Sequence, residues 1–208
     1  MIPLAPLRAR TQIVALAETL AARDCVQVTD AAARRAGVAI LIRLGAGDNL
    51  ELFFIQRSEY EGDPWSGHVA FPGGREEPGD ESLYETAARE TMEETGIDIR
   101  LHGELLGVLD DLRPRTVSLP AMVVRPFVVW LSGAPEPVLS DEVANSFWVP
   151  LPVLMDRSVW RDTTVAAGGQ EISRFAFHHE GYVVWGMTEV MLSGLLAIFG
   201  QAPGGRYV

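Results

Sequence analysis

The chain has 208 residues, 48% of them hydrophobic, which is enough to bury one core and does not require two domains. Its 17 Lys plus Arg and 28 Asp plus Glu residues give a formal net charge of −11, a field that repels nucleic acid and anionic membranes. An anionic substrate therefore needs a local cluster of positive charge or a metal ion. Cys25 is the only cysteine, which excludes an internal disulfide, and we interpret it as a buried small hydrophobic residue.

The N-terminal part of the chain predicts a helix and no membrane segment. Residues 7–22 carry apolar side chains at helical spacing, so we expect an amphipathic helix within an N-terminal helical extension over residues 1–35. No run near the start suits a signal-peptide core, and the most apolar runs, at 38–42 and 122–131, are too short to cross a bilayer. We therefore expect a cytoplasmic protein with no membrane or nucleic-acid partner.

The remaining pattern is one of paired strands with helices between them. Residues 38–44 and 50–56 are apolar and β-rich, and the turn residues 45–49 between them predict a hairpin. The other predicted elements are strands at 105–110, 121–131 and 147–149, a loop at 140–145, a short helix at 151–155, a hairpin of 172–177 with 182–185, and a C-terminal helix at 187–199. This order favours a mixed α/β sandwich, and we expect a single domain over residues 1–208.

Residues 83–95 are predicted to form a helix whose two ends are marked in the sequence. Ser82 is a suitable N-cap with Glu85 three residues further on, and Gly96 stands where a left-handed C-cap is favoured. The boundaries of this helix are therefore the best defined in the chain.

Three carboxylates share one face of this helix. Glu90, Glu93 and Glu94 stand at i, i+3 and i+4, so at about 100° per residue they point to one side and repel one another. Hard oxygen ligands gathered in this way suit Mg²⁺ or Mn²⁺, whereas the alternative is a solvated acidic face. Two neighbours favour the metal site: Arg89 can orient a carboxylate through its two-pronged guanidinium, and the pair Gly73–Gly74 lets backbone approach a metal or phosphate closely.

The stretch from Arg89 to Ile97, after an upstream glycine pair and an acidic residue, resembles the Nudix box. The family pattern is a glycine, five residues, a glutamate, seven residues, and then Arg-Glu-apolar-x-Glu-Glu-x-Gly-apolar. Glu81 and Arg89 have the family spacing, whereas six residues separate Gly74 from Glu81, and Thr91 replaces the usual aliphatic residue. The resemblance implies an α/β/α sandwich around a mixed β-sheet, with added N-terminal and C-terminal helices and with residues 73–97 as the loop-helix-loop of the box.

The activity that the resemblance implies is hydrolysis of a nucleoside diphosphate linked to another moiety. Glu90, Glu93 and Glu94 would hold Mg²⁺ or Mn²⁺, the Gly74 carbonyl would be a further ligand, and Arg89 would orient the glutamates. A metal-bound water would then be the nucleophile.

The general base of this family commonly lies outside the box. Glu142, in the loop before the strand at 147–149, is our candidate, and its alternative is an ordinary solvated glutamate of a surface loop. Asp110 and Asp111 at a strand end are weaker candidates.

Residues 52–58, 67–74 and 184–188 resemble the coenzyme A pyrophosphatase branch of the family, which shares the longer loop. The resemblance spans about residues 37–199, and it implies coenzyme A or an acyl-CoA as substrate, giving 3′,5′-ADP and 4′-phosphopantetheine. The chain departs from the branch at 61–65, where a basic residue of the branch is missing. ADP-ribose, NADH and NDP-sugars are alternative substrates, and a non-catalytic Nudix-fold nucleotide-binding regulator is an alternative function.

Residues outside the helix are predicted to contact the substrate. They are Arg57, His68, Gly73 and Gly74, with phosphate as the expected partner of Arg57. Trp65 either stacks on a base or packs within its loop. Apolar segments outside the box allow a homodimer without requiring one.

Overall fold

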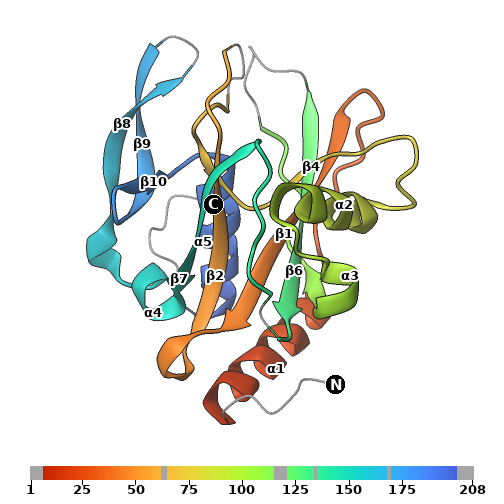
Figure 1. Ribbon diagram of the computed structural model, residues 1–208, viewed down its shortest axis with the longest axis vertical. Helices are drawn as coiled ribbons and strands as arrows, with labels where there is room; N and C mark the ends of the chain where they lie inside the picture. Colours follow the sequence, from red (N-terminus) through yellow and green to blue (C-terminus); the bar gives the residue numbers. More distant parts are fainter. Residues whose placement is uncertain (1–6, 62–64, 115–120, 134, 168–169, 201–208) are drawn as a thin grey trace.

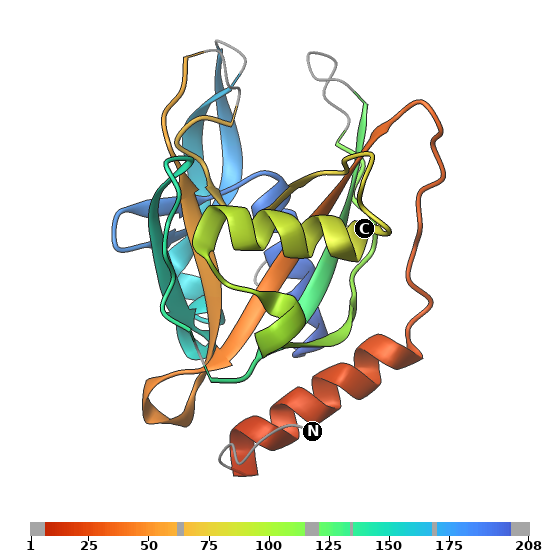
Figure 2. The same cartoon turned by 45° about the vertical axis from the view of Figure 1, so that its right-hand side comes forward.

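The computed structural model describes residues 7–61, 65–114, 121–133, 135–167 and 170–200, which form a mixed central sheet between two helical layers (Figure 1, Figure 2). In the described part of the chain this sheet has seven strands in the order β3-β2-β1-β6-β5, with β4 paired to β1 and β7 paired to β2. The strands are β1 (Arg34–Leu44), β2 (Leu50–Arg57), β3 (Val69–Ala70), β4 (Gly73–Arg75), β5 (Gly103–Val108), β6 (Met122–Leu131) and β7 (Val143–Pro150). β1 and β6 run parallel and the other pairs are antiparallel.

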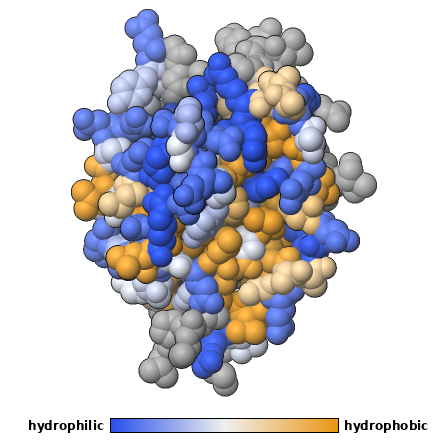
Figure 3. Space-filling view, turned by 90° about the vertical axis from the view of Figure 1, so that its right-hand side faces the viewer, coloured by the Kyte–Doolittle hydropathy of each residue, from blue (hydrophilic) through white to orange (hydrophobic). Residues whose placement is uncertain are grey.

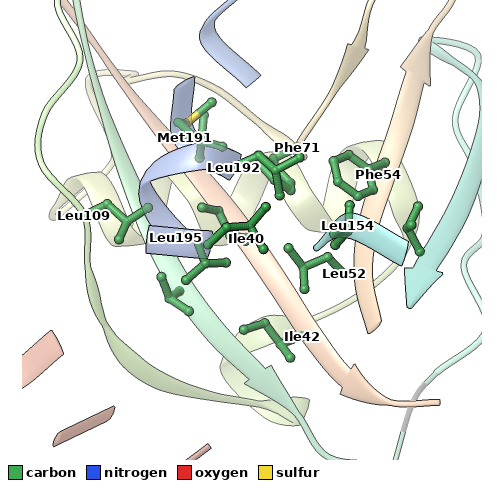
Figure 4. Packing of buried hydrophobic residues seen from close by; sticks show 14 of the residues in the cluster. Ile40, Ile42, Leu52, Phe54, Phe71, Leu109, Leu154, Met191, Leu192 and Leu195 are labelled. Carbon is green, nitrogen blue, oxygen red and sulfur yellow. The ribbon is translucent and has the colours of Figure 1, made fainter. Parts of the chain in front are cut away.

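The strand β1 separates the two halves of the core because its side chains alternate between the two faces of the sheet. Ala39 and Leu41 pack on the side of α2, whereas Ile40 and Ile42 pack on the side of α5 and α1. Figure 4 shows Ile40 beside the α5 residue Leu195, with Ile42 further along β1. The helices are α1 (Leu7–Ala22), α2 (Leu83–Thr95), α3 (Ile99–His102), α4 (Leu151–Leu154) and α5 (Met187–Ile198). The predicted α/β/α sandwich is thus confirmed.

Gly37 allows α2 to lie directly on the backbone of β1. A Cβ atom at this position would lie 3.0 Å from the Ala87 amide nitrogen and would overlap the Leu83 carbonyl oxygen. The absence of a side chain therefore sets how closely the helix packs against the sheet.

A second sheet of three described strands stands beside the first, in the order β10-β9-β8. Its strands are β8 (Trp160–Ala167), β9 (Gln170–His179) and β10 (Tyr182–Val184). The predicted hairpin between β9 and β10 is confirmed, and it turns where Glu180 and Gly181 both adopt positive φ, at 47° and 88°. Short 3₁₀ turns occupy Ala46–Asp48 and Arg157–Val159.

Most predicted elements are present, with four corrections. The N-terminal extension is shorter than predicted, since β1 begins at Arg34, and β7 begins at Val143, inside the predicted loop 140–145. The strands β3, β4 and β8 and the helix α3 were not predicted. Cys25 is half-buried, and its thiol donates to the Leu109 carbonyl at 3.0 Å, so the prediction of a buried hydrophobic residue is wrong. Among the described residues, no helix is both long and apolar enough to span a membrane.

Candidate active site

The helix α2 begins and ends where the sequence predicts. The Ser82 hydroxyl accepts a hydrogen bond from the Glu85 amide at 3.2 Å, and Gly96 is left-handed with φ 68° and donates to the Met92 carbonyl at 2.9 Å. The Glu85 carboxylate accepts from the Arg100 guanidinium at 2.6 Å and so ties α2 to α3. Both ends of the helix are therefore fixed by local hydrogen bonds.

Thr91 occupies the position at which the family pattern has an aliphatic residue. Its side chain is fully buried, and its hydroxyl donates to the Ala87 carbonyl at 2.6 Å. The polar group is thereby satisfied within the helix, so the replacement leaves no unpaired buried hydroxyl.

The glycine pair of β4 lies against two of the three carboxylates. The Gly73 amide donates to Glu94 Oε2 at 2.9 Å. A Cβ atom at Gly74 would lie 2.5 Å from Glu90 Oε1, so any larger residue there would displace the Glu90 carboxylate. The register Gly37↔Gly74 places Gly74 on the face of the sheet that α2 covers. The loop backbone and the two carboxylates therefore form one surface.

Burial sets the electrostatics of this surface. The side chain of Glu94 is 3% exposed. Burial raises the pKa of Glu94 to about 8, with a smaller contribution from the charges of Glu90 and Glu142 and against the lowering effects of the Gly73 amide and Arg57. Burial also raises the pKa of Glu90, against the lowering effect of Arg89. Two adjacent carboxyls with raised pKa values form a site at which added positive charge is favourable.

Glu93 has a different environment from its two neighbours. Its side chain is 59% exposed, and its carboxylate accepts from Arg89 Nη1 at 3.0 Å. Within the described residues no three His, Cys, Asp or Glu side chains converge as a metal-binding group. The structure therefore brings Glu90 and Glu94 to the glycine loop and holds Glu93 against Arg89.

Arg89 joins the helix to the preceding loop through all of its guanidinium nitrogens. Nε and Nη2 each donate to one Asp80 oxygen at 3.1 Å, Nη2 donates to the Arg75 carbonyl at 3.0 Å, and Nη1 donates to Glu90 at 3.1 Å and to Glu93. The orienting role of Arg89 stays a prediction, and these hydrogen bonds support it. A fork bonded at every nitrogen has little freedom to rotate.

Asp80 is the residue of this network that the sequence reasoning missed. Its side chain is 7% exposed, and it also accepts from the Glu77 amide and the Thr86 hydroxyl, both at 2.9 Å. These bonds to Arg89 and its neighbours hold the pKa of Asp80 well below its usual range. The sequence shows an acidic residue shortly before the helix, but its partner Arg89 becomes evident only when the loop is folded.

The structure brings Glu142 close enough for its charge to act on Glu90 and Glu94. Its backbone carbonyl accepts from the Ser58 amide at 2.8 Å, and the Ser140 amide in the same loop donates to the Glu94 carbonyl at 3.0 Å. The loop of Glu142 is thus attached to the C-terminal end of α2.

Asp110 and Asp111, the weaker candidates for the base, are engaged elsewhere. Asp110 pairs with Arg23 at 2.9 Å, and the buried Asp111 accepts two bonds from Arg125, at 2.8 and 2.9 Å. Asp111 also accepts from the Val28 amide at 2.8 Å. Both carboxylates therefore hold the segment between α1 and β1 in place.

The predicted substrate contacts lie in two environments. Arg57 Nη1 is 3.8 Å from Glu94 Oε1, so Arg57 faces the carboxylate cluster. The His68 ring packs against Trp185 with the ring centroids 4.6 Å apart, and its carbonyl accepts from the Arg57 amide at 3.0 Å. Trp65 is partly buried against the core, which favours packing over base stacking.

Comparison with known proteins places the chain in a family. The NUDIX domain family matches residues 33–167, which include the glycine pair, Arg89 and the three glutamates. The chain belongs to the Nudix hydrolase family.

Relatives agree with this assignment, and a solved structure has the same fold. The peroxisomal coenzyme A diphosphatase NUDT7 of Mus musculus is 30% identical over 172 residues, which cover 77% of this chain and 69% of that protein. An uncharacterized protein of Schizosaccharomyces pombe is 34% identical over 151 residues, which cover 63% of this chain and only 46% of that protein. A MutT/nudix family protein from Enterococcus faecalis has the same fold, with a TM-score of 0.53 at 19% identity over 94% of this chain and 75% of that chain.

Proposed function

We propose that the chain is a metal-dependent hydrolase that cleaves the diphosphate linkage of a nucleotide derivative, with coenzyme A or an acyl-CoA as substrate. The observation that carries the proposal is the placement of the Glu90 and Glu94 carboxylates against the Gly73–Gly74 backbone. The products from coenzyme A would be 3′,5′-ADP and 4′-phosphopantetheine. A cytoplasmic location and a homodimer stay predictions.

The donor set fits Mg²⁺ or Mn²⁺ by its chemistry. Glu90, Glu93, Glu94 and the Gly74 carbonyl would hold the ion, with Arg89 bonded to Glu90 and Glu93. The bound ion would neutralise charge on the diphosphate and lower the pKa of a water molecule. The raised pKa values of Glu90 and Glu94 fit this role, since a cation favours their charged forms.

The protein's own groups would then orient the reaction. Arg89 holds Glu90 and Glu93 from one side, and Arg57 stands next to Glu94, where its guanidinium can bind a phosphate oxygen. Glu142 is proposed as the general base, because its charge acts on both Glu90 and Glu94. His68 is proposed to contact the substrate beside the glycine loop.

Coenzyme A is favoured over other diphosphates by two observations. The mouse relative that is 30% identical to the chain is named a coenzyme A diphosphatase. The loop from Gly74 to Glu81 has the extra residue of the branch that the sequence resembles.

The test is release of products from coenzyme A, ADP-ribose, NADH, dinucleoside polyphosphates and nucleoside triphosphates with Mg²⁺, with Mn²⁺ and with EDTA. Metal-dependent formation of 3′,5′-ADP from coenzyme A is the expected result. Cleavage of another compound of the panel and not of coenzyme A would refute coenzyme A as the substrate. Absence of product from every compound would refute hydrolysis and favour a nucleotide-binding regulator.

A further inference from the structure

An open cleft of about 540 Å³ lies where β1 begins and β4 ends. Three arginines line it, Arg34, Arg35 and Arg75, together with Ala33 and Glu76. In Figure 1 this end of β1 is at the upper right, and in Figure 3 hydrophilic side chains gather over the upper part of the face that is turned toward the viewer.

The cleft is a local excess of positive charge in a strongly acidic chain. Arg35 pairs with Glu76 at 3.5 Å, whereas the exposed Arg34 and Arg75 form no ion pair with any residue that the structure describes. The chain has no lysine, so all 17 of its basic residues are arginines, against 28 acidic ones. Two guanidinium groups that form no ion pair with a described residue stand beside a third, and such a group of positive charges suits an anion.

The cleft is attached directly to the candidate active site. Arg75 follows Gly74 in the chain, and its carbonyl accepts the bond from Arg89 Nη2 at 3.0 Å. The register Ala36↔Arg75 places it one residue beyond the glycine pair on β4, and the Glu76 amide donates to the Arg35 carbonyl at 3.0 Å. The cleft therefore begins one residue beyond the glycine pair along β4.

We propose that Arg34, Arg35 and Arg75 bind a phosphomonoester of the substrate that is separate from the diphosphate to be cleaved. Arginine suits this group because its fork donates two parallel hydrogen bonds to phosphate oxygens. The inference rests on the proposed function and adds to it: the preferred substrates carry a third phosphate on the nucleotide, as 3′-phosphoadenosine derivatives do.

The first test compares binding of adenosine 3′,5′-bisphosphate and of AMP by calorimetry in EDTA. The natural chain should prefer the bisphosphate by at least about tenfold, the effect of one charge-assisted hydrogen bond, and the Arg34→Gln/Arg75→Gln variant should lose most of this preference. The matched control is Arg10→Gln/Arg174→Gln, which removes the same charge from exposed positions elsewhere. Equal preference in the cleft variant and the control would overturn the proposal, as would inorganic phosphate binding as tightly as the bisphosphate.

The second test separates this proposal from the proposed function. The ratio of kcat/KM for coenzyme A to kcat/KM for its analogue without the 3′-phosphate should fall at least about tenfold in the cleft variant and stay unchanged in the control. Failure of the natural chain to cleave either compound would refute the proposed function, while the binding experiment would still decide the role of the cleft. An unchanged ratio in the cleft variant would refute the third-phosphate site alone.

Discussion

Replacement of Asp80 by asparagine tests whether the geometry of Arg89 matters for turnover. Asp80→Asn keeps the size of the side chain but replaces one acceptor oxygen with an amino group, which is a donor. If the amino group replaces Oδ1, it faces Arg89 Nε. If it replaces Oδ2, it faces Arg89 Nη2, the Glu77 amide and the Thr86 hydroxyl. At least one of the two bonds to Arg89 is then lost. A hydrogen bond to a charged group contributes about 1.5–3 kcal/mol, and the side chain is sheltered at 7% exposed, so little of this is screened.

The expected result is a fall of kcat by about 10- to 100-fold, which corresponds to about 1.4–2.8 kcal/mol. The reason is that a freed guanidinium no longer holds Glu90 and Glu93 in one orientation. Mn²⁺ binding, followed by electron paramagnetic resonance, should weaken in parallel, a readout that does not depend on turnover. Glu77→Gln is the control, since it changes an exposed carboxylate of the same loop. Equal kcat and equal Mn²⁺ affinity in the two variants would refute the positioning role of Asp80.

Three further changes probe the site and its support. Glu93→Gln should abolish metal-dependent turnover with an unchanged circular dichroism spectrum, because Glu93 is 59% exposed and makes no core contact; near-normal activity would remove it from the metal site. Gly37→Ala should destabilise the fold by roughly 1–3 kcal/mol in urea, because its Cβ would overlap the α2 backbone, whereas Gly194→Ala on an open helix face should be neutral or stabilising. His178, whose pKa is lowered by burial and by the charge of Arg161, should make the free energy of unfolding fall as pH drops below about 6.5, where only the unfolded chain gains the proton. The fall should be shallower in His178→Phe, and identical pH curves would contradict it.

The helices and strands that the sequence predicts correctly are those with regularly spaced apolar residues or with recognisable cap residues at their ends. The helix α2 has an N-cap, a C-cap and an apolar face, so both of its ends were found. The strand β4 has three residues, two of them glycine, and β3 has two, so neither is long enough to show the alternation by which strands are recognised. The strand β4 pairs with β1, and β3 pairs with β2. These pairings depend on the tertiary structure and cannot be recognised from the short segments themselves.

In the candidate site, too, some residues can be predicted from local spacing and others only from the tertiary structure. The carboxylates of Glu90, Glu93 and Glu94 follow from helical spacing, which is local. The hydrogen bonds between Asp80 and Arg89, and the effect of the Glu142 charge on Glu90 and Glu94, depend on loops that fold back on α2, and no spacing in the sequence encodes such an approach. The sequence also could not decide the role of Asp110 and Asp111. A carboxylate at a strand end can bind a ligand or, as in this structure, an arginine and a backbone amide.

The helix α2 performs two opposed tasks, and its packing explains how both are possible. One face is inserted against β1 through Gly37 and buries Leu83 and Ala87, and burial of a leucine side chain stabilises the fold by about 1.5–3 kcal/mol. The other face crowds Glu90 and Glu94 together in a sheltered position, which is unfavourable without a cation. Because the apolar face and the capped ends fix the helix independently of the carboxylates, the helix tolerates the crowding of its acidic face. A change that loosens the apolar face should therefore reduce activity before it unfolds the chain.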